Sequence, residues 1–155
     1  MTQLNPRKFR VAAYAVVIDD GKMLLSRWIG SGEKLWILPG GGIEFGEDPY
    51  DAVIREVHEE TGYHVEVQRL LGMQTSVGKR VSNVDGLEYD YHRLRIIYEA
   101  KVVGGELTFE VDGSTDEAAW FPLDQVPALD HVESVDFGLE LLRAAPPHGH
   151  LPSFT

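Results

Sequence analysis

The segment that most constrains the fold runs from three consecutive glycines, Gly40–Gly42, into a stretch with helical spacing over residues 49–61. Asp48 is a favourable N-cap, a proline follows it at the first helical position, and Gly62 is a favourable left-handed terminator. Entry into a helix needs one or two glycines, whereas three in succession, followed by Gly46, indicate that backbone groups are presented to a ligand. No Gly-Lys-Ser/Thr follows, so the segment is not a phosphate-binding P-loop.

Three glutamates near the end of this helix, Glu56, Glu59 and Glu60, share one face because a helix turns about 100° per residue. Like charges three or four positions apart cost roughly 0.2–0.5 kcal/mol each. Acidic side chains in a last turn also oppose the helix dipole. A bound divalent cation removes both penalties, and Mg²⁺ prefers carboxylate oxygens. The alternative is an exposed acidic stripe in a globular protein that binds metal only adventitiously.

Composition restricts the class of protein. The chain has 155 residues and a formal net charge of −11, which argues against binding to a nucleic-acid duplex. We expect residues 1–145 to form a single domain and residues 146–155 to be a flexible tail. The chain lacks cysteine, which excludes disulfides and zinc–thiolate sites. No apolar run is long enough to span a membrane, so we expect a cytoplasmic protein without membrane partners.

Hydrophobic patterning indicates how the rest of the chain is organised. Strands are predicted at residues 11–18, 22–28, 63–77 and 92–103, with a short strand around Trp120, and a second helix is predicted at residues 133–145. Residues 29–34 are expected to be a flexible loop, and residues 78–91 a loop or an excursion hairpin. Strands mixed with two helices predict an α/β domain whose mixed sheet lies between helices.

The spacing of the fixed residues between positions 41 and 63 resembles the Nudix box. The matching positions are Gly41, Glu47, Arg55, Glu56, Val57, Glu59, Glu60, Gly62 and Tyr63. Tyr63 departs from the family pattern, which usually has an aliphatic residue there. Flanking segments such as "LWILPGG" and "EAAWFPLDQVP" are also similar to those of the family. The resemblance implies an α/β/α sandwich around a mixed β-sheet, and hydrolysis of a nucleoside diphosphate linked to a further group.

The same resemblance implies a metal site. It assigns the carboxylates of Glu56, Glu59 and Glu60, together with the backbone carbonyl of Gly40, to Mg²⁺, with Mn²⁺ as an alternative ion. A divalent cation would neutralise the diphosphate, which an acidic site otherwise repels. It would also acidify a bound water and stabilise the charge that develops at phosphorus.

Further roles follow from the resemblance. Arg55 and Glu47 are expected to pair and to hold the glycine loop and the glutamates in place. Glu59 is our candidate for the general base. The alternative bases are acidic residues before the late tryptophan strand, namely Asp112, Asp116 and Glu117.

The residues that select a substrate are less evident from sequence. The candidates for substrate binding are Arg27, Trp28, Gly41 and Gly42. Arg27, Lys79, Arg80 and Arg93 can meet phosphates, although a surface ion pair or plain solvation is the commoner fate of each. The expected partner is a small phosphorylated nucleotide, either a nucleoside triphosphate or a nucleotide sugar. A homodimer is left open.

A second class of function shares this fold. Some domains of the type bind a nucleotide as sensors or interaction modules without hydrolysing it. Such modules usually lose glutamates or the arginine of the box, and here all are present. The sequence therefore favours a hydrolase.

Overall fold

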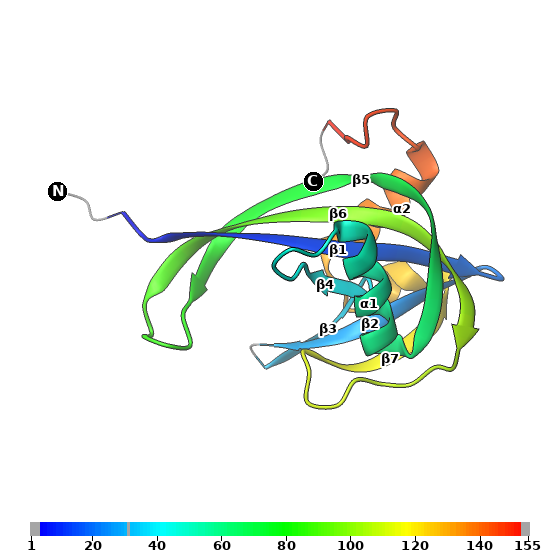
Figure 1. Cartoon of the computed structure of the whole chain (residues 1–155), viewed down its shortest axis with the longest axis horizontal. Coiled ribbons are helices and arrows are strands. Elements are labelled where there is room, and N and C mark those ends of the chain that lie inside the picture. Colours follow the sequence, from blue (N-terminus) through cyan, green and yellow to red (C-terminus); the bar gives the residue numbers. More distant parts are fainter. Residues whose placement is uncertain (1–3, 31, 153–155) are drawn as a thin grey trace.

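The computed structural model describes residues 4–30 and 32–152, and its strands form a mixed sheet with helices packed around it (Figure 1). In chain order the elements are β1 (Arg7–Asp19), β2 (Lys22–Gly30), β3 (Glu33–Ile37), β4 (Gly40–Gly42), α1 (Pro49–Thr61), β5 (Tyr63–Val81), β6 (Glu88–Gly105), β7 (Thr115–Pro122), the 3₁₀ helix η1 (Leu123–Ala128) and α2 (Glu133–Ala144). The strand order is β3-β2-β1-β6-β5, with β4 paired to β1 and β7 to β2. β1 and β6 are parallel, whereas β5 and β6 are antiparallel, so the predicted mixed sheet is confirmed.

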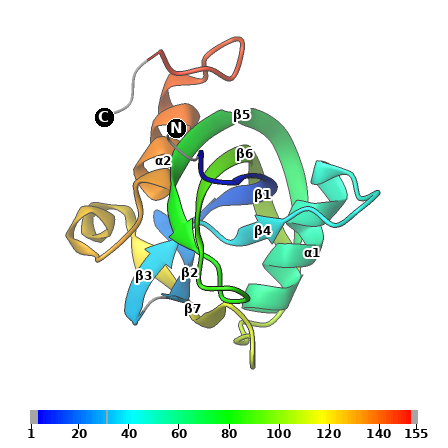
Figure 2. The ribbon, with the colours of Figure 1, turned by 90° about the vertical axis from the view of Figure 1, so that its left-hand side faces the viewer.

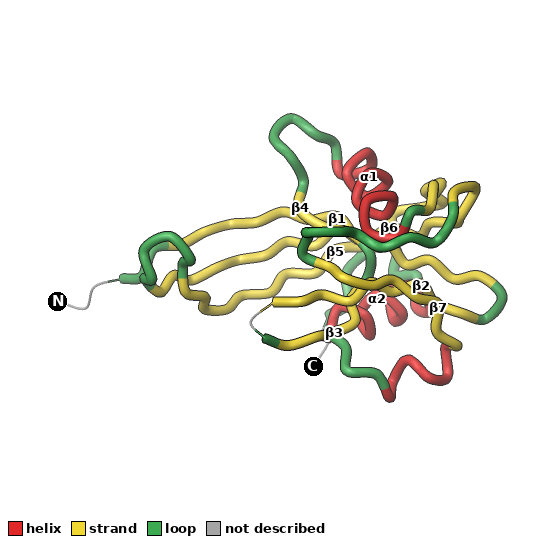
Figure 3. The backbone as a smooth tube through the Cα atoms, turned by 90° about the horizontal axis from the view of Figure 1, so that it is seen from below, coloured by secondary structure: helices red, strands yellow, loops and turns green. Residues whose placement is uncertain are grey.

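The central strand β1 supplies both layers of the core because successive side chains point to opposite faces. One layer, on the α2 side, contains Ala12, Tyr14, Val16, Leu25, Ile97, Val135 and Leu141. The other, on the α1 side, contains Ala13, Ala15, Val17, Val53, Val57 and Tyr98. Figure 3 shows α1 and α2 on opposite sides of the strands, which confirms the α/β/α arrangement.

Helix α1 begins and ends where its capping residues predict. The Asp48 side chain accepts a hydrogen bond from the Tyr50 amide at 2.8 Å, and Gly62 is left-handed with φ of 79°. Val53 and Val57 are fully buried against the sheet. Among the described residues, no helix is both long and apolar enough to cross a bilayer.

The three strands β1, β5 and β6 continue beyond the helices as a projecting arm (Figures 1 and 3), which Figure 2 shows end-on. Residues 78–81 and 88–91, for which a loop or an excursion hairpin is predicted, belong to β5 and β6, so the hairpin alternative is correct. The first residues of β1 pair in parallel with this hairpin, as at Arg10 and Arg93. Residues 78–91 look polar and turn-rich in the sequence. Their strands continue the sheet because β1 pairs with β6 along this stretch.

Two segments expected to be flexible are extended or packed. β2 and β3 pair up to Gly30 and Glu33, so residues 29, 30, 33 and 34 of the predicted loop belong to paired strands, while residue 31 lies outside the described residues. In the C-terminal segment, the Met73 amide donates a hydrogen bond to the Gly149 carbonyl at 3.0 Å, and Leu151 packs on the core. The described part of this segment, residues 146–152, therefore makes specific contacts with the sheet.

Candidate active site

The glycines of β4 lie between β1 and helix α1, where larger residues do not fit. Gly40 has φ of +149°, and a Cβ there would lie 2.2 Å from the Ala13 carbonyl oxygen. A Cβ on Gly41 would lie 2.7 Å from the Glu56 carboxyl group. The backbone of β4 therefore passes directly beneath the glutamates of the helix. Contact with the backbone of β1 is thus the reason for glycine at position 40, whereas a larger residue at position 41 would displace the Glu56 carboxyl group.

Glu60 carries the most unusual carboxyl group of the site. Its side chain is 3% exposed, and its Oε2 accepts a hydrogen bond from the Gly40 amide at 3.1 Å. Burial raises the pKa of Glu60 to about 8, an effect that the Gly40 hydrogen bond opposes. Among the described residues, no lysine or arginine forms an ion pair with it. A buried acid without a cation is costly unless it is protonated or binds a metal ion.

We expect the metal-free protein to become more stable as the pH falls from about 8 to about 5. The pKa of Glu60 is about 8 in the folded protein and near 4.3 in an unfolded chain, so between these values the folded protein binds the extra proton. The free energy of unfolding must then decrease as the pH rises through this window, by on the order of a few kcal/mol.

Thermal melts in EDTA between pH 5.5 and 8.5 check this expectation against the variant Glu60→Gln. Glu47 stays ionised throughout, because its pKa is lowered to about 2 by the Arg55 hydrogen bond. Other groups that titrate between pH 5.5 and 8.5 affect the stability of both proteins. The difference in pH dependence between the unmodified protein and Glu60→Gln therefore reports on Glu60. The same pH dependence in the two proteins would contradict the assignment.

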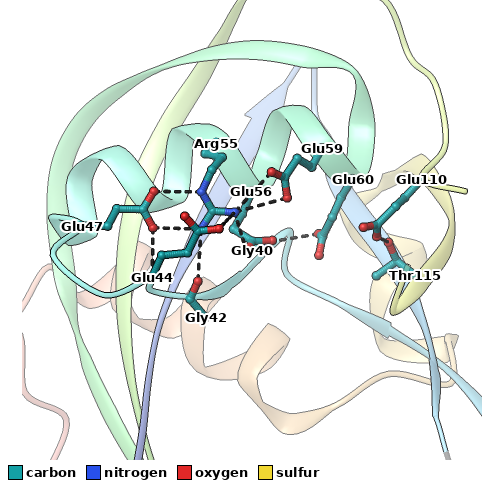
Figure 4. Close-up of polar contacts among 10 residues, drawn as sticks. All are labelled: Gly40, Gly42, Glu44, Glu47, Arg55, Glu56, Glu59, Glu60, Glu110 and Thr115. Atoms are coloured by element: carbon teal, nitrogen blue, oxygen red, sulfur yellow. Dashed lines mark hydrogen bonds and ion pairs between the residues drawn. The ribbon is translucent and has the colours of Figure 1, made fainter. Parts of the chain in front are cut away.

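Arg55 connects the loop before the helix to the glutamates on it (Figure 4). Its guanidinium donates to both carboxylate oxygens of Glu47 at 2.8 Å and to the Gly42 carbonyl at 3.2 Å. The same group donates to Glu56 at 3.0 Å and to Glu59 at 3.2 Å. These contacts raise the pKa of Arg55, chiefly through Glu47. The helical spacing suggests an outward Arg55, yet this side chain is only 25% exposed.

The glutamates of the helix differ in their surroundings. Glu56 is 16% exposed and Glu59 is 46% exposed. Burial raises the pKa of Glu56, although Arg55 acts in the opposite direction. Within residues 4–30 and 32–152, no group of three acidic or histidine side chains is arranged to hold a metal ion. Glu56 and Glu59 instead turn toward Arg55, so the expected set of metal ligands stays a prediction.

The chemistry of these acids nevertheless fits a divalent cation. Glu56 and Glu60 are both largely buried, and the negative charge of Glu56 raises the pKa of Glu60. Glu110 lies near enough to add to this effect on both, and it accepts a hydrogen bond from the Thr115 hydroxyl at 2.7 Å. Carboxylates concentrated in this way are the oxygen donors that Mg²⁺ and Mn²⁺ bind.

Glu110 was not among the residues expected from the sequence, although it belongs to the same acidic loop as those that were. Two of the alternative bases, Asp116 and Glu117, instead contact Arg27, each at 2.9 Å. Asp112 lies in an exposed turn with a left-handed backbone. The acidic composition of the loop before β7 indicated that a carboxylate from it faces the site. The path of the loop selects Glu110 for this position.

This pairing places Arg27 in an ion pair, which is the commoner fate expected of such an arginine from the sequence. Its guanidinium binds both oxygens of Asp116, and the Arg27 hydrogen bond lowers the pKa of that carboxyl group. Arg27 does not line the cavity described below, whereas its neighbour Trp28 does. Arg27 therefore links β2 to β7 through these ion pairs, and its role in substrate binding stays a prediction.

A cavity of about 210 Å³ opens from the glycines toward the arm. Its lining includes Gly40, Gly41, Gly42, Glu56, Glu60, Tyr14, Trp28, Arg10, Arg80, Arg93, Arg95 and Ser114. Trp28 and Arg80 also line a second, open groove of about 820 Å³, whose lining includes Tyr89 of the arm. Arg10 and Arg95 are lining residues that the sequence did not suggest. Arg95 follows Arg93 by two positions in a predicted strand, and this spacing could have placed its side chain on the same face of the sheet.

Comparison with known proteins gives a consistent family. Residues 8–139 match the model of the NUDIX domain. The chain is 35% identical over 124 residues to a protein of Methanocaldococcus jannaschii described as an ADP-ribose pyrophosphatase, covering 78% of this chain and 68% of that protein. It is 33% identical over 126 residues to a putative ADP-ribose pyrophosphatase of Bacillus subtilis, covering 81% of this chain and 56% of that protein.

Solved structures show the same architecture. A NUDIX hydrolase from Nitrosomonas europaea superimposes with a TM-score of 0.72 at 27% identity, covering 95% of this chain and 98% of that one. A MutT NUDIX hydrolase from Burkholderia pseudomallei superimposes with a TM-score of 0.64 at 26% identity, covering 87% of this chain and 98% of that one.

Proposed function

The chain belongs to the Nudix hydrolase family, and we propose that it hydrolyses the diphosphate linkage of a nucleoside diphosphate joined to another group, with Mg²⁺ as cofactor. The observation that carries this proposal is the shared cavity, in which the buried carboxyl groups of Glu56 and Glu60 face the glycine backbone of β4. Ionising Glu60 in the interior is costly because no lysine or arginine of the described residues pairs with it, and a cation beside an open cavity suits a phosphorylated substrate.

The proposed metal ligands are Glu56, Glu59, Glu60 and the Gly40 carbonyl. When bound there, Mg²⁺ supplies charge neutralisation for the diphosphate and lowers the pKa of a coordinated water. Glu60 must lose its proton to take part, so binding should release a proton at neutral pH. Mn²⁺ has similar ligand preferences and should replace Mg²⁺.

The protein's own groups then position the reactants. Arg55 fixes Glu47 and the Gly42 carbonyl on the loop side and reaches Glu56 on the helix side, so it sets the distance between them. A carboxylate takes the proton of the attacking water, while the water oxygen bonds to phosphorus. The bridging P–O bond breaks and the leaving phosphate keeps its electron pair. Glu59 is our candidate for this base, and Glu110 is the alternative that the structure adds.

The test is a panel of nucleoside triphosphates and nucleotide sugars with Mg²⁺, in which released nucleoside monophosphate is identified. We expect turnover by the unmodified protein and a large loss in Glu59→Gln, because Glu59 serves either as ligand or as base. Glu110→Gln in parallel separates the two candidates for the base. Nucleotide binding without turnover of any compound would favour the sensor function in place of hydrolysis.

A further inference from the structure

One face of the arm gathers basic side chains next to the proposed catalytic site. Arg10 of β1 lies beside Arg93 of β6, and Arg95 follows two residues later on the same face. Both β6 arginines line the cavity together with Arg10 and Arg80. A Cβ on Gly42 would lie 3.3 Å from the Arg10 Nη2, so the cluster lies directly beside the glycine strand. We call Arg10, Arg93 and Arg95 the arginine cluster.

The arginine cluster has no acidic counterpart. In the part of the chain that the structure describes, no carboxylate forms an ion pair with any of the three, although the chain has 25 acidic residues. Arg95 donates to the neutral oxygens of Ser76 at 3.0 Å and Gln74 at 3.5 Å. The Arg93 Nε is buried and has no hydrogen-bond partner. The chain thus places like charges together and leaves their donors available.

This arrangement is costly without a ligand. Burial lowers the pKa of Arg93, and the charges of Arg95 and Arg10 act in the same direction, whereas Tyr14 and Tyr91 oppose the shift. Aromatic rings hold the guanidinium groups in place: Arg93 lies 5.4 Å from the centre of the Tyr91 ring, and Arg95 lies 6.0 Å from that of Tyr14. Oriented arginines that lack an acid are suited to phosphate, which accepts several hydrogen bonds from guanidinium groups.

We propose that the arginine cluster binds a third phosphate of the substrate, so that the preferred substrates are nucleoside triphosphates. This proposal rests on the proposed hydrolase function. The diphosphate to be cleaved would lie at the glycines and glutamates, and the additional phosphate at the arginines a short distance along the same cavity. In a nucleotide sugar a neutral ring takes the place of that phosphate, which would leave the buried Arg93 donor unpaired. The cluster therefore selects for charge on the group attached to the diphosphate.

Matched substrate pairs test this directly: ATP with ADP-ribose, GTP with GDP-mannose, and UTP with UDP-glucose. Each pair shares its base, ribose and diphosphate and differs in the attached group. We expect a higher kcat/KM for the triphosphate in the pair that is turned over. Arg93→Gln should lower that value by about 10- to 100-fold and change the value for the sugar nucleotide by no more than about threefold. A preference for the sugar nucleotide, or an equal loss on both compounds, would overturn the proposal.

Controls separate loss of charge from loss of fold. Arg93→Lys keeps the charge and should retain more of the preference for triphosphate. Arg10→Gln alters the same cluster at an exposed position, so it should weaken triphosphate use even if Arg93→Gln is unstable. Arg69→Gln removes a positive charge that pairs with Glu99 outside the cavity, and it should leave the preference unchanged.

Binding measurements distinguish this proposal from the proposed hydrolysis. In Glu56→Gln, calorimetric titration should show that the triphosphate of a pair binds more tightly than its sugar nucleotide, and adding Arg93→Gln should remove the difference. Binding that depends on Arg93, without turnover by the unmodified protein, would sink the hydrolase function and support the phosphate subsite. Turnover together with binding that ignores Arg93 would support the hydrolase and sink the subsite.

Discussion

Replacing Glu56 by glutamine should lower kcat/KM for the best substrate of the panel by about a thousandfold or more, since a bound metal ion is worth several kcal/mol in such reactions. Glu56 is a proposed ligand whose carboxyl group lies beside Gly41, where an added Cβ would come within 2.7 Å of it. The change keeps the shape of the side chain and removes its charge. Steady-state kinetics over a range of Mg²⁺ concentrations measure the effect.

The matched control for Glu56→Gln is Asp51→Asn, which removes an exposed charge from the same helix away from the cavity. It should keep nearly full activity. Mg²⁺ should raise the melting temperature of the unmodified protein and of Asp51→Asn, and have little effect on Glu56→Gln. If Mg²⁺ stabilised all three proteins equally, the glutamates would be an ordinary acidic stripe.

Arg55→Lys should reduce kcat by about a hundredfold and the free energy of unfolding by about 1–3 kcal/mol. Lysine keeps the positive charge, but a single ammonium group cannot donate to Glu47, the Gly42 carbonyl and Glu56 at once. The loop and the helix would then lose their common anchor. Denaturant unfolding and steady-state kinetics give the two quantities.

A double variant checks the expected effect of Arg55→Lys on the free energy of unfolding. Glu47→Gln weakens the same connection from the other side, so the effects of the two changes on stability should be less than additive in the double variant. Full additivity, or an active and stable Arg55→Lys, would show that Arg55 does not position the site.

The parts of the fold that depend on local signals could be predicted. Helix α1 has its boundaries because Asp48 and Gly62 act on neighbouring backbone groups. The arm could not be predicted with the same certainty, because its strand pairing depends on residues distant in sequence, as at Arg7 and Asp90. Tyr63 illustrates a similar limit: its hydroxyl accepts a hydrogen bond from the Trp120 indole at 3.0 Å, a partner that the sequence does not indicate.

In the candidate site, too, residues close in sequence could be predicted and residues distant in sequence could not. The glutamates and Arg55 lie in one helix, so their spacing alone places them together. Glu110 comes from a loop whose path is set by packing, and Arg10 reaches the cavity only through the register of β1 on β6. Arg27 looked available for phosphate because its partner Asp116 lies 89 positions away. Sequence spacing thus could not identify the site residues that only the tertiary structure brings together.

The proposed hydrolysis requires that the glutamates of α1 and the Gly40 carbonyl hold a divalent ion beside the glycine strand. Crystals grown with Mn²⁺ and a non-hydrolysable nucleotide, measured at the manganese absorption edge, test it most directly. We expect an anomalous peak within ligand distance of Glu56, Glu60 and the Gly40 carbonyl, with Glu59 turned from Arg55 toward the ion. Anomalous peaks confined to other parts of the surface, with Glu56 and Glu59 still bound to Arg55, would contradict it.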